Sequence, residues 1–182
     1  MAHWLLINGS PRINGKSMRV MQLFQMMCES RYPEVTLTTF EIARRIVGGC
    51  DGCDYCKGDE DCIIEDDMFD LYDALPTIDR LIIVTPIYFA GLPSQMKAIC
   101  DRLQPYYWKY EDRLRTGSPA PEKRPLTLYL IGDGGDPHGH DGAVVSIRAA
   151  FQLAGFKIEE VRELIGLKRI KPDNLLGETG TL

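Results

Sequence analysis

The stretch WLLINGSPRINGKS, residues 4–17, decides the fold class of this chain. It opens with a continuous apolar run at residues 4–7, which is typical of a strand buried on both faces. A turn follows, and from Ser17 onward the apolar residues adopt helical spacing. They are Val20, Leu23, Phe24, Met27 and Cys28. A buried strand that leads directly into an amphipathic helix predicts a parallel β–α unit, with Cys28 in its core.

The same alternation of strand and helix continues along the chain. Further strands are predicted at residues 35–40, 80–85, 125–131 and 156–161. Helices are predicted at about 65–75, from Pro93 until Pro105, and up to Gly155 at a C′ position. Cys100 lies on the apolar face of the second of these helices, so we expect it in the core. Residues 105–124 are expected to form a long irregular connection.

The composition of the strands also predicts their order in the sheet. The first, third and fourth strands are nearly all apolar, as central strands are, whereas the second and fifth are more polar, as edges are. This distribution fits the order 2-1-3-4-5. We therefore predict an α/β fold: a flavodoxin-like three-layer sandwich around a five-stranded parallel sheet.

Length, charge and hydropathy limit the functions that this chain can have. With 182 residues we expect one domain over 1–182, carrying a cysteine-rich loop at 50–62. The net charge of −5 argues against a nucleic acid or an anionic membrane as partner. Apolar runs of about five residues are too short for a membrane span. The first residues lack the pattern of a signal peptide, so we expect a cytoplasmic protein.

The loop NGSPRINGKS, residues 8–17, ends in the Gly-Lys-Ser of a nucleotide triphosphate loop, but its spacing differs. A triphosphate loop has four residues between its first Gly and the Gly-Lys-Ser, whereas five separate Gly9 from Gly15. Pro11 also has no N–H to offer to a phosphate cradle. The sequence therefore disfavours an ATP- or GTP-binding phosphotransfer enzyme.

The same loop suits a single phosphate, because it runs from a central strand into a helix N-terminus. Free N–H groups and the helix dipole favour an anion there. Hydroxyls and positive charges are added by Ser10, Ser17, Arg12 and Lys16. The alternative is an ordinary turn in which Ser17 is only the helix N-cap.

Two further loops are expected beside this one, because the first, third and fourth strands are neighbours in the predicted order. They contain TPIYFAGLPSQMKAICDR after the third strand and IGDGGDPHGHDG after the fourth. The former offers Tyr88 and Phe89 to a flat ring, although core or subunit packing is an alternative for both. The latter has Gly132, Gly134 and Gly135 around Asp133, where backbone can approach a ring closely. A phosphate pocket beside a flat-ring pocket describes FMN.

Three motifs, NGSPRINGKS, GCDGCDYCKGDEDCIIEDDM and TPIYFAGLPSQMKAICDR, resemble the NADPH-dependent FMN reductase and iron–sulfur flavoprotein family, and the similarity covers about residues 3–165. The resemblance implies a flavodoxin-like fold, bound FMN and a homodimer or homotetramer with flavins near subunit interfaces. It implies a phosphate loop of Ser10, Arg12, Lys16, Ser17 and Met18, and a flavin border of Pro86, Ile87, Tyr88, Phe89 and Gly91. Lys16 departs from the Asn that is frequent in the family.

Four of the six cysteines are clustered with compact spacing: Cys50, Cys53, Cys56 and Cys62. Such spacing can surround an iron–sulfur cluster, and it resembles the four-cysteine motif that holds [4Fe–4S] in iron–sulfur flavoproteins. Zinc, which more often takes two separated Cys pairs, and free or redox-active thiols are the alternatives. Several acidic residues surround the thiols: Asp51, Asp54, Asp59, Glu60 and Asp61. Their negative charge would lower the reduction potential of a cluster. The alternative is that they form only a solvated acidic loop.

The leading functional hypothesis is an FMN-dependent oxidoreductase in which the flavin, and no catalytic side chain, carries the electron chemistry. With a cluster, a ferredoxin-type donor could supply the flavin, which would reduce a small-molecule acceptor. Without one, NAD(P)H would be the co-substrate of an FMN or quinone reductase. His138 and His140 are candidate proton donors, or simply part of a polar surface loop. A non-enzymatic zinc or thiol sensor on the same scaffold is the other alternative.

Overall fold

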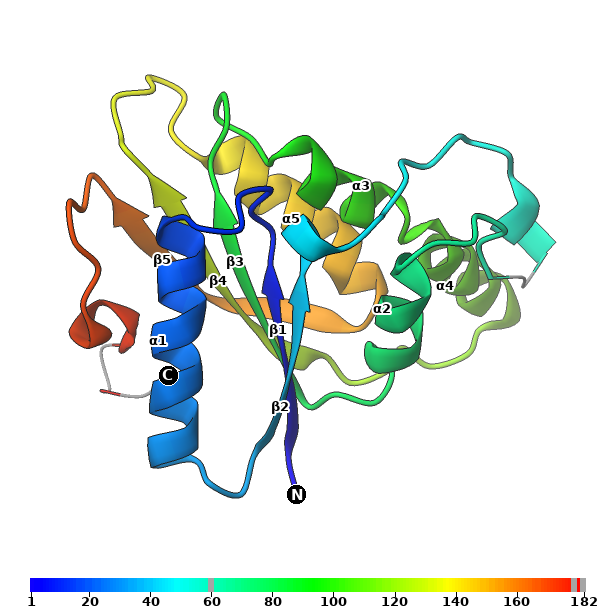
Figure 1. Ribbon diagram of the computed structural model, residues 1–182. Coiled ribbons are helices and arrows are strands. Elements are labelled where there is room, and N and C mark those ends of the chain that lie inside the picture. The colour runs from blue at the N-terminus through cyan, green and yellow to red at the C-terminus, as the bar shows by residue number, and fades with distance from the viewer. Residues whose placement is uncertain (59–60, 178–179, 181–182) are drawn as a thin grey trace.

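The computed structural model describes residues 1–58, 61–177 and 180, which form a central sheet covered by helices on both faces (Figure 1). The five strands follow the order β2-β1-β3-β4-β5, and all neighbouring pairs are parallel. The strands are β1 (His3–Asn8), β2 (Thr36–Glu41), β3 (Arg80–Pro86), β4 (Arg124–Gly132) and β5 (Phe156–Ile165). The predicted flavodoxin-like order is confirmed.

The helices divide between the two faces of the sheet (Figure 1). On one face lie α1 (Lys16–Arg31) and the short helix η3 (Pro172–Leu175). On the other lie α2 (Met68–Ala74), α3 (Ser94–Asp101) and α5 (Asp141–Leu153). Farther from the sheet, α4 (Gln104–Thr116) contacts α5 and η2 (Tyr55–Gly58), while η1 (Ile42–Arg44) follows β2.

The continuous apolar runs of the central strands have a simple structural reason. Successive side chains of a strand point to opposite faces, and both faces of this sheet are covered. In β1, Leu5 and Ile7 therefore join the core below α2, α3 and α5, whereas Leu6 packs with Phe24 of α1. All four of these side chains are at most 1% exposed.

The prediction of a long irregular connection at residues 105–124 was wrong. Most of it forms α4, and Pro105 lies in the first turn of this helix instead of ending the preceding one. A proline is tolerated there because the N–H that it lacks would have no acceptor within the helix. The helix was missed because Pro105 was interpreted as a helix end, although a proline is equally at home in the first turn.

Two other boundaries differ from the prediction, and a third agrees with it. The helix expected from about residue 65 begins at Met68, whose N–H donates to Asp66 Oδ1 at 3.0 Å. The fifth strand continues to Ile165, where it still pairs with Gly132. Gly155, with φ of 91°, follows α5 as predicted.

The two cysteines predicted in the core are buried there, Cys28 at 2% and Cys100 at 7% exposure. Within the described part of the chain, no helix has both the length and the apolar character required to cross a membrane.

Candidate functional site

The loop between β1 and α1 turns sharply at the carboxyl end of the sheet. Its turn is held by two short-range hydrogen bonds: the Ser10 N–H donates to Asn8 Oδ1 at 3.1 Å, and the Arg12 N–H donates to Ser10 Oγ at 3.2 Å. Gly9 lies so close to the neighbouring elements that an added Cβ would be 2.8 Å from the sulfur of Met96. The loop is therefore packed tightly onto β3 and α3 before any ligand is considered.

The N-terminus of α1 is arranged to receive an anion. Its N-cap is Gly15, which has no side chain to bond the first N–H groups, and its first turn contains no acidic residue. Ser17 in that turn is 2% exposed and Ser10 in the loop is 3% exposed. Ser17 is therefore not the N-cap, and its hydroxyl lies inside the first turn, where it can add to the amide donors.

The remaining phosphate-loop residues differ in their surroundings. Arg12 is exposed, and Met18 packs its side chain against the core on the α1 side of the sheet. Met18 can therefore offer a ligand only its backbone. Lys16 reaches across to the loop after β4, where its Nζ donates to Asp133 Oδ1 at 2.6 Å.

A buried donor at this edge has no partner among the described residues. The Nδ2 atom of Asn8, the last residue of β1, makes no hydrogen bond in that part of the chain, although Asn8 is 1% exposed. Leaving such a group unsatisfied costs about 1–3 kcal/mol, which a hydrogen-bonding ligand or water would recover. Asn8 could not be predicted as part of the site, because an amide that ends a strand carries no signature of its own.

The loop after β3 contains the strained backbone of the site. Tyr88 and Gly91 exchange backbone hydrogen bonds of 3.0 Å, and between them Phe89 and Ala90 have φ of 48° and 60°. Non-glycine residues rarely adopt this left-handed conformation, which clusters at functional sites. The Phe89 side chain is fully exposed at 102%. Pro86, which ends β3, precedes this turn and pairs with Ile131 of β4.

A cavity of about 360 Å³ lies between the loops that follow β3 and β4. Of the residues predicted for the site, it brings together Ile87, Phe89, Gly132, Asp133, Gly134 and Gly135. Gly134 and Gly135 have φ of 84° and 87°, a conformation that strongly favours glycine. The volume lies at the lower end of the range for small-molecule and cofactor sites.

The other predicted residues lie outside that cavity: Ser10, Arg12, Lys16, Ser17, Met18, Pro86, Tyr88 and Gly91. Lys16 is linked to it through Asp133, and the hydrogen bond from Lys16 lowers the pKa of the Asp133 carboxyl. The two halves of the predicted site are thus adjacent rather than merged.

Six residues that line the cavity were not in the predicted set: Ala90, Asp136, Gly139, His140, Glu163 and Ile165. Glu163 and Ile165 also line the cavity, and they were missed because the fifth strand was expected to end at residue 161. His140 lines it too, with Nε2 3.3 Å from Glu163 Oε1, whereas His138 does not. Of the two histidines considered as proton donors, only His140 reaches the cavity.

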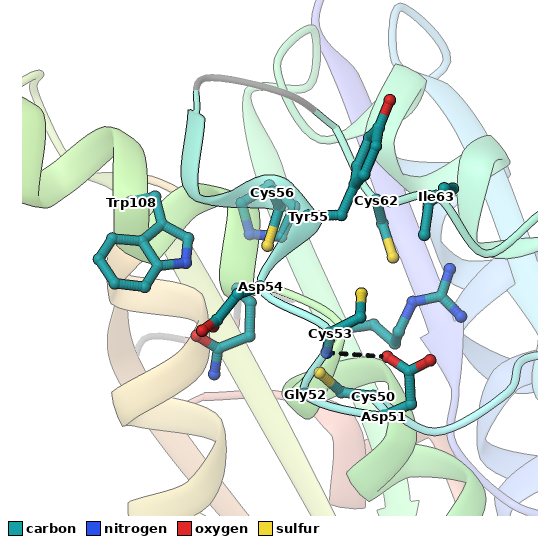
Figure 2. A pocket seen from close by; sticks show the side chains of 13 residues that line it. Cys50, Asp51, Gly52, Cys53, Asp54, Tyr55, Cys56, Cys62, Ile63 and Trp108 are labelled. Carbon is teal, nitrogen blue, oxygen red and sulfur yellow. Dashed lines mark hydrogen bonds between the residues drawn. The ribbon is translucent and has the colours of Figure 1, made fainter.

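A second cavity, of about 250 Å³, is lined by all four clustered cysteines (Figure 2). Figure 2 shows them around this space, with Trp108 of α4 at one side. Burial and, to a smaller degree, the charges of the other three thiols raise the pKa of the Cys56 thiol. Among the described residues, no three His, Cys, Asp or Glu side chains are already gathered to hold a metal ion.

The donor set of this second cavity nevertheless fits a thiolate-ligated metal group. All four thiols line this cavity, and so does Arg102, whose Nε is buried without a partner among the described residues. Sulfur-rich clusters accept N–H hydrogen bonds, so such a donor is compatible with a cluster. Of the acidic residues noted around the thiols, Asp51 and Asp54 line the cavity, Asp61 pairs with Lys109 at 3.2 Å, and Asp59 and Glu60 lie outside the described residues.

The fold and the loops at its carboxyl edge define a flavodoxin-like α/β protein. The model of the NADPH-dependent FMN reductase family matches residues 2–160, and the chain belongs to that family. An iron-sulfur flavoprotein of Archaeoglobus fulgidus is 34% identical over 96 residues, which are 53% of this chain and 48% of that protein. The chain spans about half the length of the curated relatives that it matches.

Two solved structures share the fold at low identity. One is an FMN-dependent NADH-azoreductase of Bacillus anthracis in complex with FMN, with a TM-score of 0.64, 14% identity and coverage of 94% of this chain and 91% of that one. The other is an NAD(P)H:quinone oxidoreductase of Methanothermobacter marburgensis, with a TM-score of 0.65, 13% identity and coverage of 95% and 91%.

Proposed function

We propose that this chain is an FMN-dependent oxidoreductase that binds its flavin at the carboxyl edge of the sheet. The observation that carries the proposal is the adjacency of an uncapped α1 N-terminus and a glycine-lined cavity, linked by the Lys16–Asp133 hydrogen bond of 2.6 Å. Family membership and the FMN complex of the azoreductase support the choice of flavin. Bound FMN would supply hydride and single-electron transfer.

The chain's own residues would bind and orient this cofactor. The first N–H groups of α1 and the hydroxyls of Ser10 and Ser17 would hold the phosphate, with Arg12 and Lys16 supplying charge. The loop containing Tyr88 and the backbone around Gly134 would border the ring.

The denatured protein tests this proposal directly. Protein purified with its natural cofactor and then denatured should release FMN rather than FAD. If reconstitution with FMN gives neither a flavin spectrum nor measurable affinity, the central proposal is lost.

We further propose that Cys50, Cys53, Cys56 and Cys62 hold a [4Fe–4S] cluster. Their common cavity and the name of the curated relative from Archaeoglobus fulgidus support it. The cluster would supply one-electron transfer, suited to a ferredoxin-type donor. Among the described residues the thiols are not gathered, so cluster binding would draw them together around the metal. Anaerobic protein should contain iron and sulfide, and stoichiometric zinc in their place would overturn this part.

A cluster-free reductase that uses NAD(P)H is the second candidate, favoured by the azoreductase and quinone oxidoreductase neighbours. It would show flavin reduction by NAD(P)H at a rate that is the same with and without iron.

In either form we propose a homodimer or homotetramer and a small-molecule electron acceptor. A zinc or thiol sensor would instead retain zinc and bind no flavin, which the same metal and flavin assays would show.

A further inference from the structure

Arg102 closes the base of the cysteine loop. Its guanidinium donates to Asp66 through two hydrogen bonds, from Nη1 at 2.7 Å and Nη2 at 3.2 Å. It also donates to the carbonyl oxygens of Gly48 at 3.2 Å and Ile64 at 2.9 Å. Gly48 precedes the first clustered cysteine and Ile64 follows the last, so a single side chain from the end of α3 joins both ends of the loop.

The charge of Arg102 is held away from water. Its side chain is 0% exposed and that of Asp66 is 6% exposed. Asp66 Oδ2 also accepts the N–H of Gly48 at 2.7 Å, which fixes the carboxylate beneath the loop. Charges in such an environment act more strongly on their neighbours than the exposed acids of the loop, because solvent screens the latter.

One donor of Arg102 remains without a partner among the described residues. A guanidinium has five N–H groups. The four on Nη1 and Nη2 are accounted for by the two carboxylate and two carbonyl oxygens. The fifth, on Nε, is buried and has no partner in the described part of the chain, and Arg102 lines the cavity of the four cysteines.

We propose that Arg102 is a positioning and potential-setting residue of the cysteine site: its Nε–H donates to a sulfur atom of the bound cluster or of a ligating thiolate. This role rests on the proposed cluster. Hydrogen bonds to sulfur and nearby positive charge stabilise the more reduced state, so Arg102 raises the reduction potential against the surrounding carboxylates. If Arg102 only held the loop closed and did not contact sulfur, this would explain the hydrogen bonds of Nη1 and Nη2. It would not explain why the buried Nε donor has no partner among the described residues.

Two substitutions with opposite expected effects separate this role from a structural one. Arg102→Lys keeps the positive charge but removes the Nε–H, so the potential should become more negative. Asp66→Asn keeps Arg102 and a similar shape but removes the compensating negative charge, so the potential should become more positive. A residue that only supported the loop would change cluster occupancy and stability, without shifting the potential in opposite directions.

Arg124 offers a matched control at the amino end of β4. It too is a partly buried arginine that donates to backbone carbonyls, those of Leu75 and Ile78 at 2.7 Å and Ala154 at 3.2 Å, but it does not line the cysteine cavity. Arg124→Lys should lower the Tm and leave the potential unchanged.

The measurement is an anaerobic redox titration followed by EPR on the full chain, with iron and sulfide content and Tm determined on the same samples. Opposite shifts for Arg102→Lys and Asp66→Asn, with no shift for Arg124→Lys, are expected. If the variants contain a cluster that has the wild-type potential, the role of Arg102 is overturned, while the proposed cluster stands. If Arg102→Lys retains no cluster, the potential of Asp66→Asn is the test. An unchanged or more negative potential in Asp66→Asn overturns the role of Arg102. Wild-type protein that takes up no iron and sulfide overturns the cluster itself, and this role with it.

Discussion

The proposed flavin edge, formed by the loops after β1, β3 and β4, and the cysteine loop of this protein are built in different ways. The loops of the flavin edge follow three adjacent strands, so the parallel sheet itself brings them together. The cysteine loop leaves the sheet after β2 and returns at α2, and it is closed by the buried Arg102–Asp66 pair. The first region therefore follows from the strand order, whereas the closure of the loop depends on contacts between residues that are far apart in sequence.

The two regions also differ in what they need from a ligand. At the proposed flavin edge, the α1 N-terminus has no side-chain cap, and Gly134 and Gly135 have a left-handed backbone conformation. In the cysteine loop, the thiols share a cavity but are not gathered among the described residues. We therefore expect substitutions to act on the two regions independently.

The largest effect is expected from Cys56→Ser. A cluster needs all four thiolates, so this variant should lose its iron completely. It should keep its FMN, because Cys56 does not line the flavin cavity. Cys100→Ser is the control, since this buried thiol lies in the α3 core, and it should keep iron even if the protein is less stable. Iron assays and flavin absorbance on both variants check the prediction, and loss of both cofactors from Cys56→Ser would contradict the independence of the two sites.

Breaking the loop closure should be the next largest effect. Arg102→Ala leaves the Asp66 carboxylate buried without its partner, which costs about 3–5 kcal/mol in the free energy of unfolding. Lys109→Ala removes the exposed Lys109–Asp61 pair of 3.2 Å and should cost at most about 1 kcal/mol. Urea unfolding of the two variants measures the difference, and equal costs would show that the buried pair does not close the loop.

The sequence predicted the flavin edge more completely than the cysteine loop, because the first depends on local patterns and the second on contacts between distant residues. Strand burial and order follow from local apolar patterns, so the meeting of the three flavin loops followed from the order 2-1-3-4-5. The four cysteines were found by their spacing, but Arg102 was not, because it pairs with Asp66, 36 positions away in sequence, at a distance that no local pattern encodes. α4 was missed because Pro105 was interpreted as a helix end, and Glu163 because a strand boundary was placed too early.

A smaller effect is expected at the phosphate loop. Ser17→Ala removes a buried hydroxyl assigned to the phosphate, and a hydrogen bond to a charged group is worth about 1.5–3 kcal/mol. FMN affinity should therefore fall about 10- to 100-fold, while riboflavin affinity changes little. Arg12→Ala should show the same selectivity for FMN with a smaller loss, since Arg12 is exposed. Flavin fluorescence titrations measure both, and equal weakening of the two flavins would move these residues out of the phosphate site.

The strained turn after β3 should respond only weakly. Phe89→Gly removes a Cβ from a residue with φ of 48°, a strain worth about 1–3 kcal/mol, which the greater backbone entropy of Gly partly offsets. We expect a net gain below about 1 kcal/mol in the free energy of unfolding. Phe89→Ala keeps the Cβ and should give no gain. Chemical denaturation of the apo-protein distinguishes the two, and equal stability of both variants would mean that the turn stores no strain.

The smallest effect concerns the link between the two halves of the flavin edge. Hydrogen bonding to Lys16 lowers the pKa of Asp133, so the ionised carboxylate is the form that the folded protein favours. A lowered folded-state pKa contributes stability above the ordinary range of the carboxyl, and this contribution is lost as the pH falls through the folded-state pKa. Because Asp133 is fully exposed, the stability at stake is slight, and the pKa itself is the better quantity to measure. Lys16→Gln should raise the pKa of Asp133 toward its ordinary value in an NMR titration of the apo-protein. FMN should then raise it further in that variant, because the phosphate brings negative charge nearby. If FMN left the pKa of Asp133 unchanged, the phosphate would not lie beside this link, and the two halves would not form one site.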